Sequence, residues 1–433
     1  MDELIKSFIT DKNILILGYG REGRSTLKRL METGGYKTVT VADAKDISDD
    51  LPVDVSSCCG SSYMDFLDDY DYVFKSPGVV LPKPIESYSC EFTSQTEIFI
   101  RAYKNQIIGV TGTKGKSTTS SLLWHVLKVS GKDVLFAGNI GIPVFDIERK
   151  VTPRSVIVIE LSCHQLEYAK TSPHKSVLLN IYEDHLDHYG TRENYAKAKK
   201  NIYLNQTGDD ILYTTKETFE KEIEDCPSKT VVIDSSCLPF SSFSDIEGCK
   251  LEGAHNISNA AFVYMISKTY GITDREFIHA LATFEPLPHR LQNIGCYDGV
   301  DYYDDSISTT VKSTISAVES VSNASIILIG GMERNIAYEE LVNYLCHSGL
   351  NFIICMYESG ARFFEMYENA EKPVNAPLAI KVSDLEEAVI VAKQKAVKGE
   401  AVLLSPAAAS YGYFKNFEER GDVFSDLVKN HSI

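Results

Sequence analysis

Residues 107–123 read IIGVTGTKGKSTTSSLL, a short apolar strand that runs into a glycine loop and then into a helix. Gly112 and Gly115 let backbone N–H groups turn inward and approach an anion. Lys116 supplies a positive charge, and Ser117 supplies a hydroxyl that can ligate Mg²⁺. Because loop N–H groups and a helix N-terminus both favour phosphate, the stretch predicts a phosphate-binding loop.

The match of this loop to the P-loop pattern is good but imperfect, because Val110 stands where the pattern has its first glycine. The alternative is an ordinary glycine-rich turn between a strand and a helix. The run TGTKGKSTT favours a nucleoside triphosphate, since it combines the glycines, the lysine and several hydroxyls. We expect the helix to open after Thr118. The predicted nucleotide-binding residues of the loop are Gly112, Thr113, Lys114, Gly115, Lys116, Ser117 and Thr118.

Length and composition limit the class of protein. A chain of 433 residues favours two or three domains, each large enough to bury a core. It has no apolar run of about 18 residues, and the opening MDELIKSFITDK lacks the features of a secretory signal. The formal net charge of −17 argues against nonspecific binding to nucleic acid or anionic membranes. Ten scattered cysteines without a CxxC pair favour reduced thiols, so we expect a cytoplasmic protein. Separately, we expect a monomer.

A second glycine loop lies near the N-terminus, in the stretch NILILGYGREGRSTLKR. An apolar strand at Ile14–Leu17 runs into a full GxGxxG motif that opens a helix. A second strand, Thr38–Val41, leads to Asp43, about 20 residues beyond the motif. This is the pattern of a dinucleotide-binding fingerprint, although the same geometry binds any pyrophosphate at a helix N-terminus.

The order of strands and helices predicts an α/β protein with largely parallel sheets. A strand at Tyr72–Phe74 ends in a tight Ser76-Pro77-Gly78 loop, on the side of the sheet where ligands bind. Prolines after this loop indicate a crossover, and Pro286 and Pro288 indicate a linker. The predicted domains are residues 1–100, 101–285 and 286–433.

Two strand ends in the predicted central domain carry candidate metal ligands. The strand Ser155–Ile159 is followed by Glu160, where a P-loop domain places a metal-binding carboxylate. A helix-capping role is the alternative for this glutamate. The strand Ser176–Asn180 is followed by His185.

Two helices of the predicted central domain carry further polar residues. The helix TRENYAKAKKNIY carries Lys197, Lys199 and Lys200, which the pattern alone would place on a solvated basic face. Asn256 and Asn259 are three residues apart in GAHNISNAAFVYMIS, and hence lie on one helix face.

Several motifs together resemble the Mur ligase family over essentially the whole chain. They are TGTKGKSTT, GNIG, ELSCHQLE, HLDHYG with YAKAKKNIY, GAHNISNA, PHRLQ, DDSISTT and SPAAASYGYFKNFEERG. The C-terminal run and the length are most similar to those of the member that adds D-glutamate to UDP-N-acetylmuramoyl-L-alanine. The resemblance implies three domains: an N-terminal Rossmann-like UDP-binding domain, a central P-loop ATPase domain and a C-terminal Rossmann-like domain.

The resemblance also implies a reaction. ATP would phosphorylate the free carboxylate of the UDP-linked substrate, and the amino group of D-glutamate would attack the acyl phosphate to form an amide, ADP and phosphate. Bringing two anions together requires cations, here two Mg²⁺ ions and Lys116. We expect a hinge near Leu287–Leu291, because the C-terminal domain must close on the nucleotide.

The resemblance assigns roles to the nucleotide and metal ligands. Lys116 would contact the β and γ phosphates, Ser117 and Glu160 would hold one Mg²⁺, and His185 would ligate the second. Lys199 aligns with a lysine that the family carbamylates, although Lys197 or Lys200 would take its place if the helix register shifted. The remaining predicted ATP ligands are Asn256 and Asn259 at the base, Arg290 at the phosphates and Asp305 at the ribose.

For the substrates, the resemblance assigns the UDP group to Arg21, Glu22, Asp43 and Gly78. Asn139 would bind the second metal or the substrate. The incoming D-glutamate would meet the C-terminal residues Thr309, Arg334, Ser410, Tyr411 and Phe417.

Some residues depart from the family pattern in the predicted amino-acid site. Ile307 stands where well-known members have a lysine, and Arg334 stands where they often have another. Arginine can hold a carboxylate with two hydrogen bonds, but isoleucine cannot. Glu333 and Asn335 are also atypical. The identity of the amino acid is therefore less firmly predicted than the use of ATP.

Three other functions compete with this interpretation. A sibling ligase would use another amino acid or an acceptor such as folate, but the folate ligases lack a separate leading GxGxxG domain. A nicotinamide oxidoreductase would explain Asp43 and leave TGTKGKSTT unexplained. A noncatalytic nucleotide-binding protein would not need Lys116, Glu160, His185 and Lys199 together.

Overall fold

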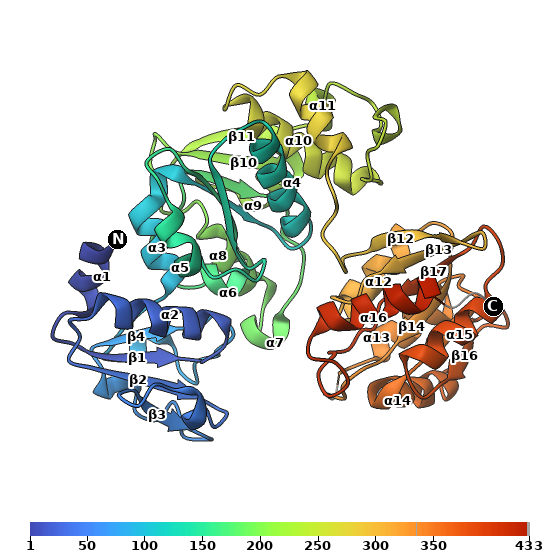
Figure 1. Ribbon diagram of the computed structural model, residues 1–433, viewed down its shortest axis with the longest axis horizontal. Coiled ribbons are helices and arrows are strands. Elements are labelled where there is room, and N and C mark those ends of the chain that lie inside the picture. Colours follow the sequence, from blue (N-terminus) through green and yellow to red (C-terminus); the bar gives the residue numbers. More distant parts are fainter. Residues whose placement is uncertain (335, 431–433) are drawn as a thin grey trace. The chain divides into compact units, whose positions relative to one another are not determined.

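The structure is a computed structural model that describes residues 1–334 and 336–430 (Figure 1). The chain forms two compact units, Met1–Glu285 and Pro286–Ile433. The first unit contains two β-sheets and the second contains one. The predicted α/β class with parallel sheets is confirmed, whereas the division of the first unit near residue 100 stays a prediction.

The N-terminal sheet is parallel, with the strand order β3-β2-β1-β4-β5. Its strands are β1 (Asn13–Leu17), β2 (Thr38–Asp43), β3 (Ser56–Cys59), β4 (Tyr72–Lys75) and β5 (Glu91–Thr93). The helices of this region are α1 (Asp2–Ile9), α2 (Arg21–Thr33) and α3 (Gln95–Tyr103). This is a Rossmann-like order, in which ligands bind where the order reverses, between β1 and β4.

The second sheet of the first unit is also parallel, in the order β11-β10-β9-β6-β8-β7. Its strands are β6 (Ile107–Thr111), β7 (Val134–Gly138), β8 (Val156–Glu160), β9 (Lys175–Leu178), β10 (Ile211–Thr215) and β11 (Lys229–Ile233). The helices are α4 (Lys116–Val129), α5 (Val144–Ile147), α6 (Cys163–Leu166), α7 (Leu186–Tyr189), α8 (Arg192–Lys200), α9 (Lys216–Glu222), α10 (Ala254–Lys268) and α11 (Asp274–Ala282). Because β6 lies between β8 and β9, the segments after these three strands meet at one edge.

The second unit contains the sheet β12-β13-β17-β14-β15-β16, in which β12 runs antiparallel to β13 and the other pairs are parallel. Its strands are β12 (Gln292–Tyr297), β13 (Val300–Asp304), β14 (Ala324–Ile329), β15 (Phe352–Cys355), β16 (Leu378–Lys381) and β17 (Ala401–Leu404). Its helices are α12 (Val311–Ser320), α13 (Glu339–Cys346), α14 (Tyr357–Glu368), α15 (Leu385–Lys395) and α16 (Phe417–Asn430). The segments that follow β13, β14 and β17 therefore share one edge of this sheet.

Burial explains why the apolar runs form central strands. Every residue of β6 is buried, and so is every residue of β17, as expected for parallel strands covered on both faces.

One prediction was wrong in detail, because α4 begins at Lys116 and not after Thr118. Gly115 is left-handed, with φ of 86°, and so ends the loop and starts the helix earlier than expected.

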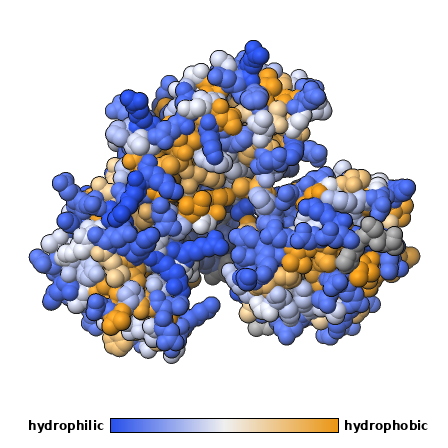
Figure 2. Space-filling model, viewed as in Figure 1, coloured by the Kyte–Doolittle hydropathy of each residue, from blue (hydrophilic) through white to orange (hydrophobic). Residues whose placement is uncertain are grey.

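On the face shown in Figure 2, hydrophilic side chains cover most of the surface, with smaller hydrophobic patches between them. Within the described residues, no helix is long and apolar enough to cross a membrane.

Candidate active site

The phosphate loop is closed by its own lysine. The Lys116 Nζ atom donates hydrogen bonds to the carbonyl oxygens of Gly112 and Thr113, each at 3.0 Å. The charge of Lys116 therefore lies over the loop at the N-terminus of α4, where phosphate is expected. Ser117, the next residue, is buried, and its hydroxyl donates no hydrogen bond within the part of the chain that the structure describes. That hydroxyl is therefore available for a metal ion.

Lys199 reaches the same carbonyl from α8. Its side chain is buried, and Nζ donates a hydrogen bond of 2.8 Å to the Gly112 oxygen. Burial, together with the charge of Lys116, lowers the pKa of Lys199 from 10.5 to about 7. Lys197 is exposed and Lys200 pairs with Glu222, so the helix register selects Lys199 among the three candidates.

Glu160 ends β8 with its side chain fully buried. Its Oε1 accepts a hydrogen bond of 2.7 Å from Asn139 Nδ2, and Ser120 Oγ lies 3.5 Å from Oε2. Both partners are neutral, and no ion pair to Glu160 occurs among the described residues. A buried carboxylate that makes no ion pair is unfavourable, so its position suits a cation.

Asn180, which sequence reasoning did not select, braces the phosphate loop. Its Oδ1 accepts hydrogen bonds from the backbone N–H groups of Thr113, at 3.0 Å, and Lys114, at 2.9 Å. Its Nδ2 donates to the Lys114 carbonyl at 3.1 Å. The N–H groups of Thr113 and Lys114 are therefore committed to Asn180, which leaves the first turn of α4 for phosphate. An amide residue two positions after β9, the strand beside β6, was the available signal.

His185 lies in a cluster of aromatic rings on the chain between β9 and α8. It has a positive φ of 51°, and its side chain is 42% exposed. The His164 ring lies between His185 and His188, with centroid distances of 5.0 and 4.6 Å. His188 Nε2 is 3.1 Å from a carboxylate oxygen of Glu167, which supports a structural role for that histidine.

Asn256 and Asn259 lie in the first turns of α10, as the spacing predicts. Asn259 Nδ2 donates to Asn256 Oδ1 at 3.1 Å, so the two amides orient each other. Gly115 has no room for a side chain, because a Cβ there would lie 2.6 Å from Asn259 Oδ1. This close approach places Asn259 directly against the phosphate loop.

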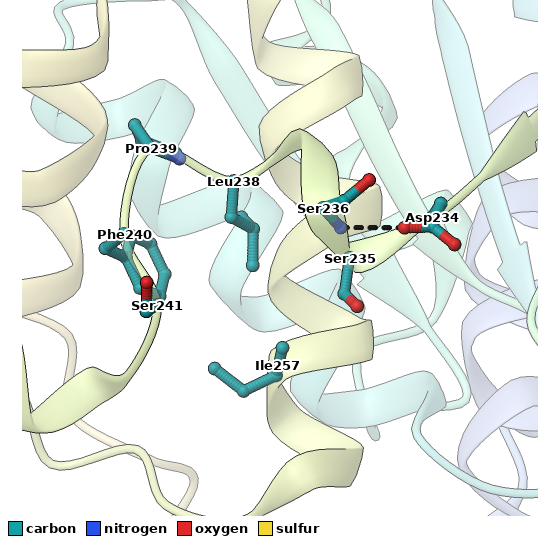
Figure 3. A pocket seen from close by; sticks show the side chains of 8 residues that line it. All are labelled: Asp234, Ser235, Ser236, Leu238, Pro239, Phe240, Ser241 and Ile257. Atoms are coloured by element: carbon teal, nitrogen blue, oxygen red, sulfur yellow. Dashed lines mark hydrogen bonds between the residues drawn. The ribbon is translucent and has the colours of Figure 1, made fainter.

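A pocket of about 470 Å³ opens beside α10 (Figure 3). Its lining residues are Asp234, Ser235, Ser236, Leu238, Pro239, Phe240, Ser241 and Ile257. None of them is a predicted site residue. The pocket therefore adds nothing to the assignment of the phosphate loop.

The GxGxxG loop after β1 is tightly packed. A Cβ on Gly23 would lie 2.0 Å from the Gly18 carbonyl oxygen, so only glycine lets α2 approach the loop. Ser76, after β4, donates a hydrogen bond of 2.9 Å to the same oxygen. Asp43 Oδ2 accepts from the backbone N–H of Tyr19 at 2.7 Å, so this predicted ligand also braces the loop. Gly78 lies in the open part of the loop after β4, where a Cβ would meet nothing within 4 Å.

Arg21 and Glu22, in the first turn of α2, face the loops of the second sheet. The Arg21 Nη1 atom lies 2.8 Å from where a Cβ of Gly141 would stand. Glu22 Oε1 accepts a hydrogen bond of 2.7 Å from Gln165 Nε2, and burial raises the pKa of Glu22 to about 7. Nearby, Lys75 Nζ is 3.9 Å from Glu167, and burial lowers the pKa of this lysine. The two sheets of the first unit thus meet through polar contacts at the predicted UDP site.

In the second unit, Asp305 lies just after β13 and is buried. Its Oδ1 accepts from the Leu291 N–H at 3.1 Å, and its Oδ2 accepts from Ser405 Oγ at 2.8 Å. Burial raises the pKa of Asp305 to about 7. Arg290 precedes Leu291, and its side chain makes no hydrogen bond, ion pair or ring contact within the described residues. Asp305 therefore braces the turn that carries Arg290, a connection that the sequence did not predict.

The residues that were predicted to bind the incoming amino acid lie at two places in this unit. Arg334 stands over the Tyr411 ring, with 5.6 Å between the guanidinium carbon and the ring centroid. The Tyr411 side chain is exposed, whereas the neighbouring Ser410 is buried. Glu333 forms an ion pair with Arg362 at 2.8 Å, so its carboxylate is already bound within the protein. Asn335 lies outside the described residues.

Around the start of α16, Ser306 Oγ donates a hydrogen bond of 2.8 Å to the Phe417 carbonyl. The backbone N–H of Ile307 donates to the His289 carbonyl at 3.2 Å. Thr309 is partly buried just before the N-cap of α12. Ile307 therefore holds the linker through its backbone N–H, and this hydrogen bond does not depend on the Ile307 side chain.

Comparison with known proteins decides the family. The Mur ligase middle domain matches residues 110–266. The UDP-N-acetylmuramoylalanine–D-glutamate ligase of Streptococcus agalactiae serotype III is 31% identical over 97% of each chain. The enzyme of the same name from Leuconostoc citreum is 32% identical over 97% of this chain and 98% of its own. The chain belongs to the Mur ligase family.

Solved structures of Mur ligases share the fold along the whole chain. The MurF ligase from Thermotoga maritima, solved in complex with ADP, has a TM-score of 0.58 at 18% identity and covers 99% of this chain and 98% of its own. The UDP-N-acetylmuramate–alanine ligase from the same organism has a TM-score of 0.56 at 18% identity, covering 96% of this chain and 99% of its own. These likenesses concern the fold alone.

Proposed function

We propose that this Mur ligase joins D-glutamate to UDP-N-acetylmuramoyl-L-alanine with the hydrolysis of ATP to ADP and phosphate, a step of peptidoglycan precursor synthesis. Similarity over 97% of the chain to ligases of that name supports this reaction. The observation that carries the proposal is the meeting of Lys116 and Lys199 at the Gly112 carbonyl. A protein that only binds nucleotide needs the first lysine but has no use for a buried second one.

In the proposed mechanism, the first turn of α4 and Lys116 hold the ATP phosphates in line with the substrate carboxylate. A carboxylate oxygen attacks the γ-phosphorus, and the bond to the ADP oxygen breaks. The amine of D-glutamate then attacks the carbonyl carbon of the acyl phosphate. Phosphate leaves with the electrons of the C–O bond, and the amine loses a proton. Lys116 offsets the negative charge that gathers in both steps.

The buried carboxylate of Glu160 and the hydroxyl of Ser117 fit Mg²⁺, which prefers oxygen ligands. When bound, the metal would neutralise phosphate charge and polarise the transferred group. We propose a second Mg²⁺ held by His185 and Lys199. Asn139 holds the Glu160 carboxylate in place through its 2.7 Å hydrogen bond.

Lys199 suits the proposed carbamylation because its pKa of about 7 leaves much of the side chain as a neutral amine at neutral pH. The nitrogen lone pair would attack CO₂, an N–C bond would form, and one proton would be released. The product is an anionic carbamate with two oxygen ligands for a cation. Labelling with ¹³C-bicarbonate should give a carbamate NMR signal that is absent from the Lys199→Met variant.

We further propose that the N-terminal region, residues 1–100, binds the UDP group at the loops after β1 and β4 through Arg21, Glu22, Asp43 and Gly78. Residues 101–285 would bind ATP, with Asn256 and Asn259 at the base. Residues 286–433 would supply Arg290 and Asp305 to the nucleotide and would bind D-glutamate through Thr309, Arg334, Ser410, Tyr411 and Phe417. We expect a monomeric, cytoplasmic enzyme.

Phosphate release from ATP with UDP-N-acetylmuramoyl-L-alanine tests the proposal. The assay adds D-glutamate, L-glutamate, L-alanine, L-lysine and meso-diaminopimelate in turn. Release with D-glutamate alone would support the assignment and show that Ile307 and Arg334 are tolerated. Release with another amino acid would keep the mechanism and change the specificity. Silence with all five would favour a nucleotide-binding protein without ligase activity.

A further inference from the structure

The turn that carries Arg290 has an unusual backbone. His289 and Leu291, its two neighbours, both have positive φ, of 62° and 48°. Residues with a side chain rarely adopt this conformation, and bulky ones such as leucine are especially disfavoured. Such a backbone persists only where its surroundings hold it in place.

Asp304 holds the first of these residues. The His289 side chain is buried, and its Nδ1 lies 2.7 Å from Asp304 Oδ2. The other oxygen of Asp304 accepts the backbone N–H of Ser306 at 2.9 Å. Burial opposes a charge on His289, but Asp304 outweighs it, and the pKa of the imidazole is raised. Asp304 thus ties the turn to the end of β13.

Asp305, the next residue, holds the other side of the turn through the Leu291 N–H, at 3.1 Å. Its second oxygen is fixed by Ser405, which follows β17, the strand beside β13. The consecutive carboxylates of Asp304 and Asp305 therefore hold the residues on both sides of Arg290. We call these contacts with His289 and Leu291 the grip.

Helix α16 closes over this arrangement. A Cβ on Gly421 would lie 2.1 Å from His289 Nδ1 and 2.5 Å from Asp304 Oδ2, so the helix backbone leaves no space above the pair. Arg420, fully buried beside it, donates to the Ser306 carbonyl at 2.7 Å and to the Ala408 carbonyl at 3.0 Å. The grip on His289 is thus part of the packed core of the second unit.

Arg290 itself makes no hydrogen bond, ion pair or ring contact among the described residues. We propose that Asp304 is a positioning residue: acting through His289, and with Asp305 on the far side, it fixes the turn in advance so that the Arg290 guanidinium is presented to a phosphate group of the nucleotide. The inference rests on the proposed use of ATP. A preformed turn spares the ordering cost that a flexible arginine would incur on binding.

Hydrogen exchange on the full chain without ligand tests the grip itself. The Asp304→Asn variant keeps the acceptor for Ser306 but loses the charge that holds His289. The His289→Asn variant keeps a residue that tolerates positive φ and loses the imidazole. We expect exchange of the Leu291 amide to rise about tenfold or more in both. Asp301→Asn, on the same strand, is the control and should leave it unchanged. Unchanged exchange in both test variants would overturn the inference.

Calorimetric binding of Mg²⁺–ATP tests whether the grip acts through Arg290. We expect Asp304→Asn and Arg290→Gln each to weaken binding about tenfold, and the double variant to be no more than about twofold weaker than Arg290→Gln. Independent effects that multiply to about a hundredfold, or normal binding by either single variant, would overturn the inference. Wild-type protein that binds ATP but releases no phosphate would refute the ligase function and leave this result standing.

Discussion

At the residue scale, the Gly112 carbonyl is the meeting point of two lysines with different surroundings. Lys116 donates a hydrogen bond to this carbonyl from within the same loop, whereas Lys199 donates to it from α8 with a buried side chain. Like charges at one acceptor repel each other, and burial further disfavours the charged form of Lys199. A lysine that only binds phosphate would keep its charge more easily at a surface position. The buried position of Lys199 therefore favours a reactive neutral amine over a phosphate ligand.

This unfavourable burial predicts a pH-dependent gain in stability for Lys199→Met. The pKa of Lys199 is about 7 when folded and 10.5 when unperturbed. Below pH 7 both states carry the proton, and the folded wild type bears the full cost of burying it. Between pH 7 and pH 10.5 the unfolded state binds more protons than the folded state, so the stability of the wild type rises with pH. The variant should be more stable by on the order of 5 kcal/mol at pH 6, and the gap should narrow towards pH 10.

Thermal unfolding in buffer free of metal and CO₂ measures this gap. Lys197→Met, a change at an exposed position of the same helix, is the matched control and should shift stability little at any pH. A gap of constant size from pH 6 to pH 10 would refute the folded-state pKa.

At the element scale, the phosphate loop depends on a strand other than its own. Asn180 follows β9 and holds the loop after β6 by three side-chain hydrogen bonds. The Asn180→Ala variant should raise the KM for ATP about tenfold or more, since the loop amides lose their fixed acceptor and the phosphates lose their aligned site. Steady-state phosphate release measures it.

The control for that variant is Asn205→Ala. Asn205 lies in the same unit, and its side chain donates one hydrogen bond, of 3.3 Å, to Ala169. It should leave the KM near the wild-type value. If both variants raise the KM equally, the effect belongs to general destabilisation and not to the loop.

The GxGxxG loop offers a matched pair of glycines on a second element. A Cβ on Gly23 would lie 2.0 Å from the Gly18 carbonyl oxygen, while one on Gly20 meets nothing within 4 Å. Gly23→Ala should therefore lower the free energy of unfolding by about 2 kcal/mol or more, because backbone must move. Gly20→Ala should change it by less than about 0.5 kcal/mol. Urea unfolding compares them, and similar values for the two would contradict the close packing of α2 on the loop.

At the scale of the whole molecule, the proposed ATP ligands are divided between the two units. Asn256 and Asn259 belong to the first, while Arg290 and Asp305 belong to the second. A single nucleotide held by both sets would have to contact both units. The grip on His289 and Leu291 narrows the expected hinge, because those residues are fixed to the second unit. Bending should therefore occur at Leu287 and Pro288, the part of the expected range that precedes His289.

We expect the radius of gyration to fall when Mg²⁺–ATP and the UDP-linked substrate are both present. Small-angle X-ray scattering measures it, with AMP and free UDP as a control pair that should produce less closure. An unchanged radius with both substrates at saturating concentration would contradict closure.

The sequence by itself determined the order of strands and helices, the phosphate loop and the family. These follow from local patterns: apolar runs of strand length, glycines at tight turns, and motifs read along the chain. The end of β8 at Glu160 and the paired asparagines of α10 were predicted in this way. The start of α4 was predicted less well, since the left-handed Gly115 starts the helix at the lysine–serine pair.

Tertiary structure alone decided which residues meet. Helix register placed Lys199, and not Lys197 or Lys200, at the Gly112 carbonyl, because burial on α8 depends on packing and not on composition. Tertiary structure also placed Asn180 against the phosphate loop, and it placed Asp305 against the Leu291 N–H of the linker. Parallel strands bring their carboxyl ends to one edge from distant parts of the chain, and no local pattern encodes that proximity.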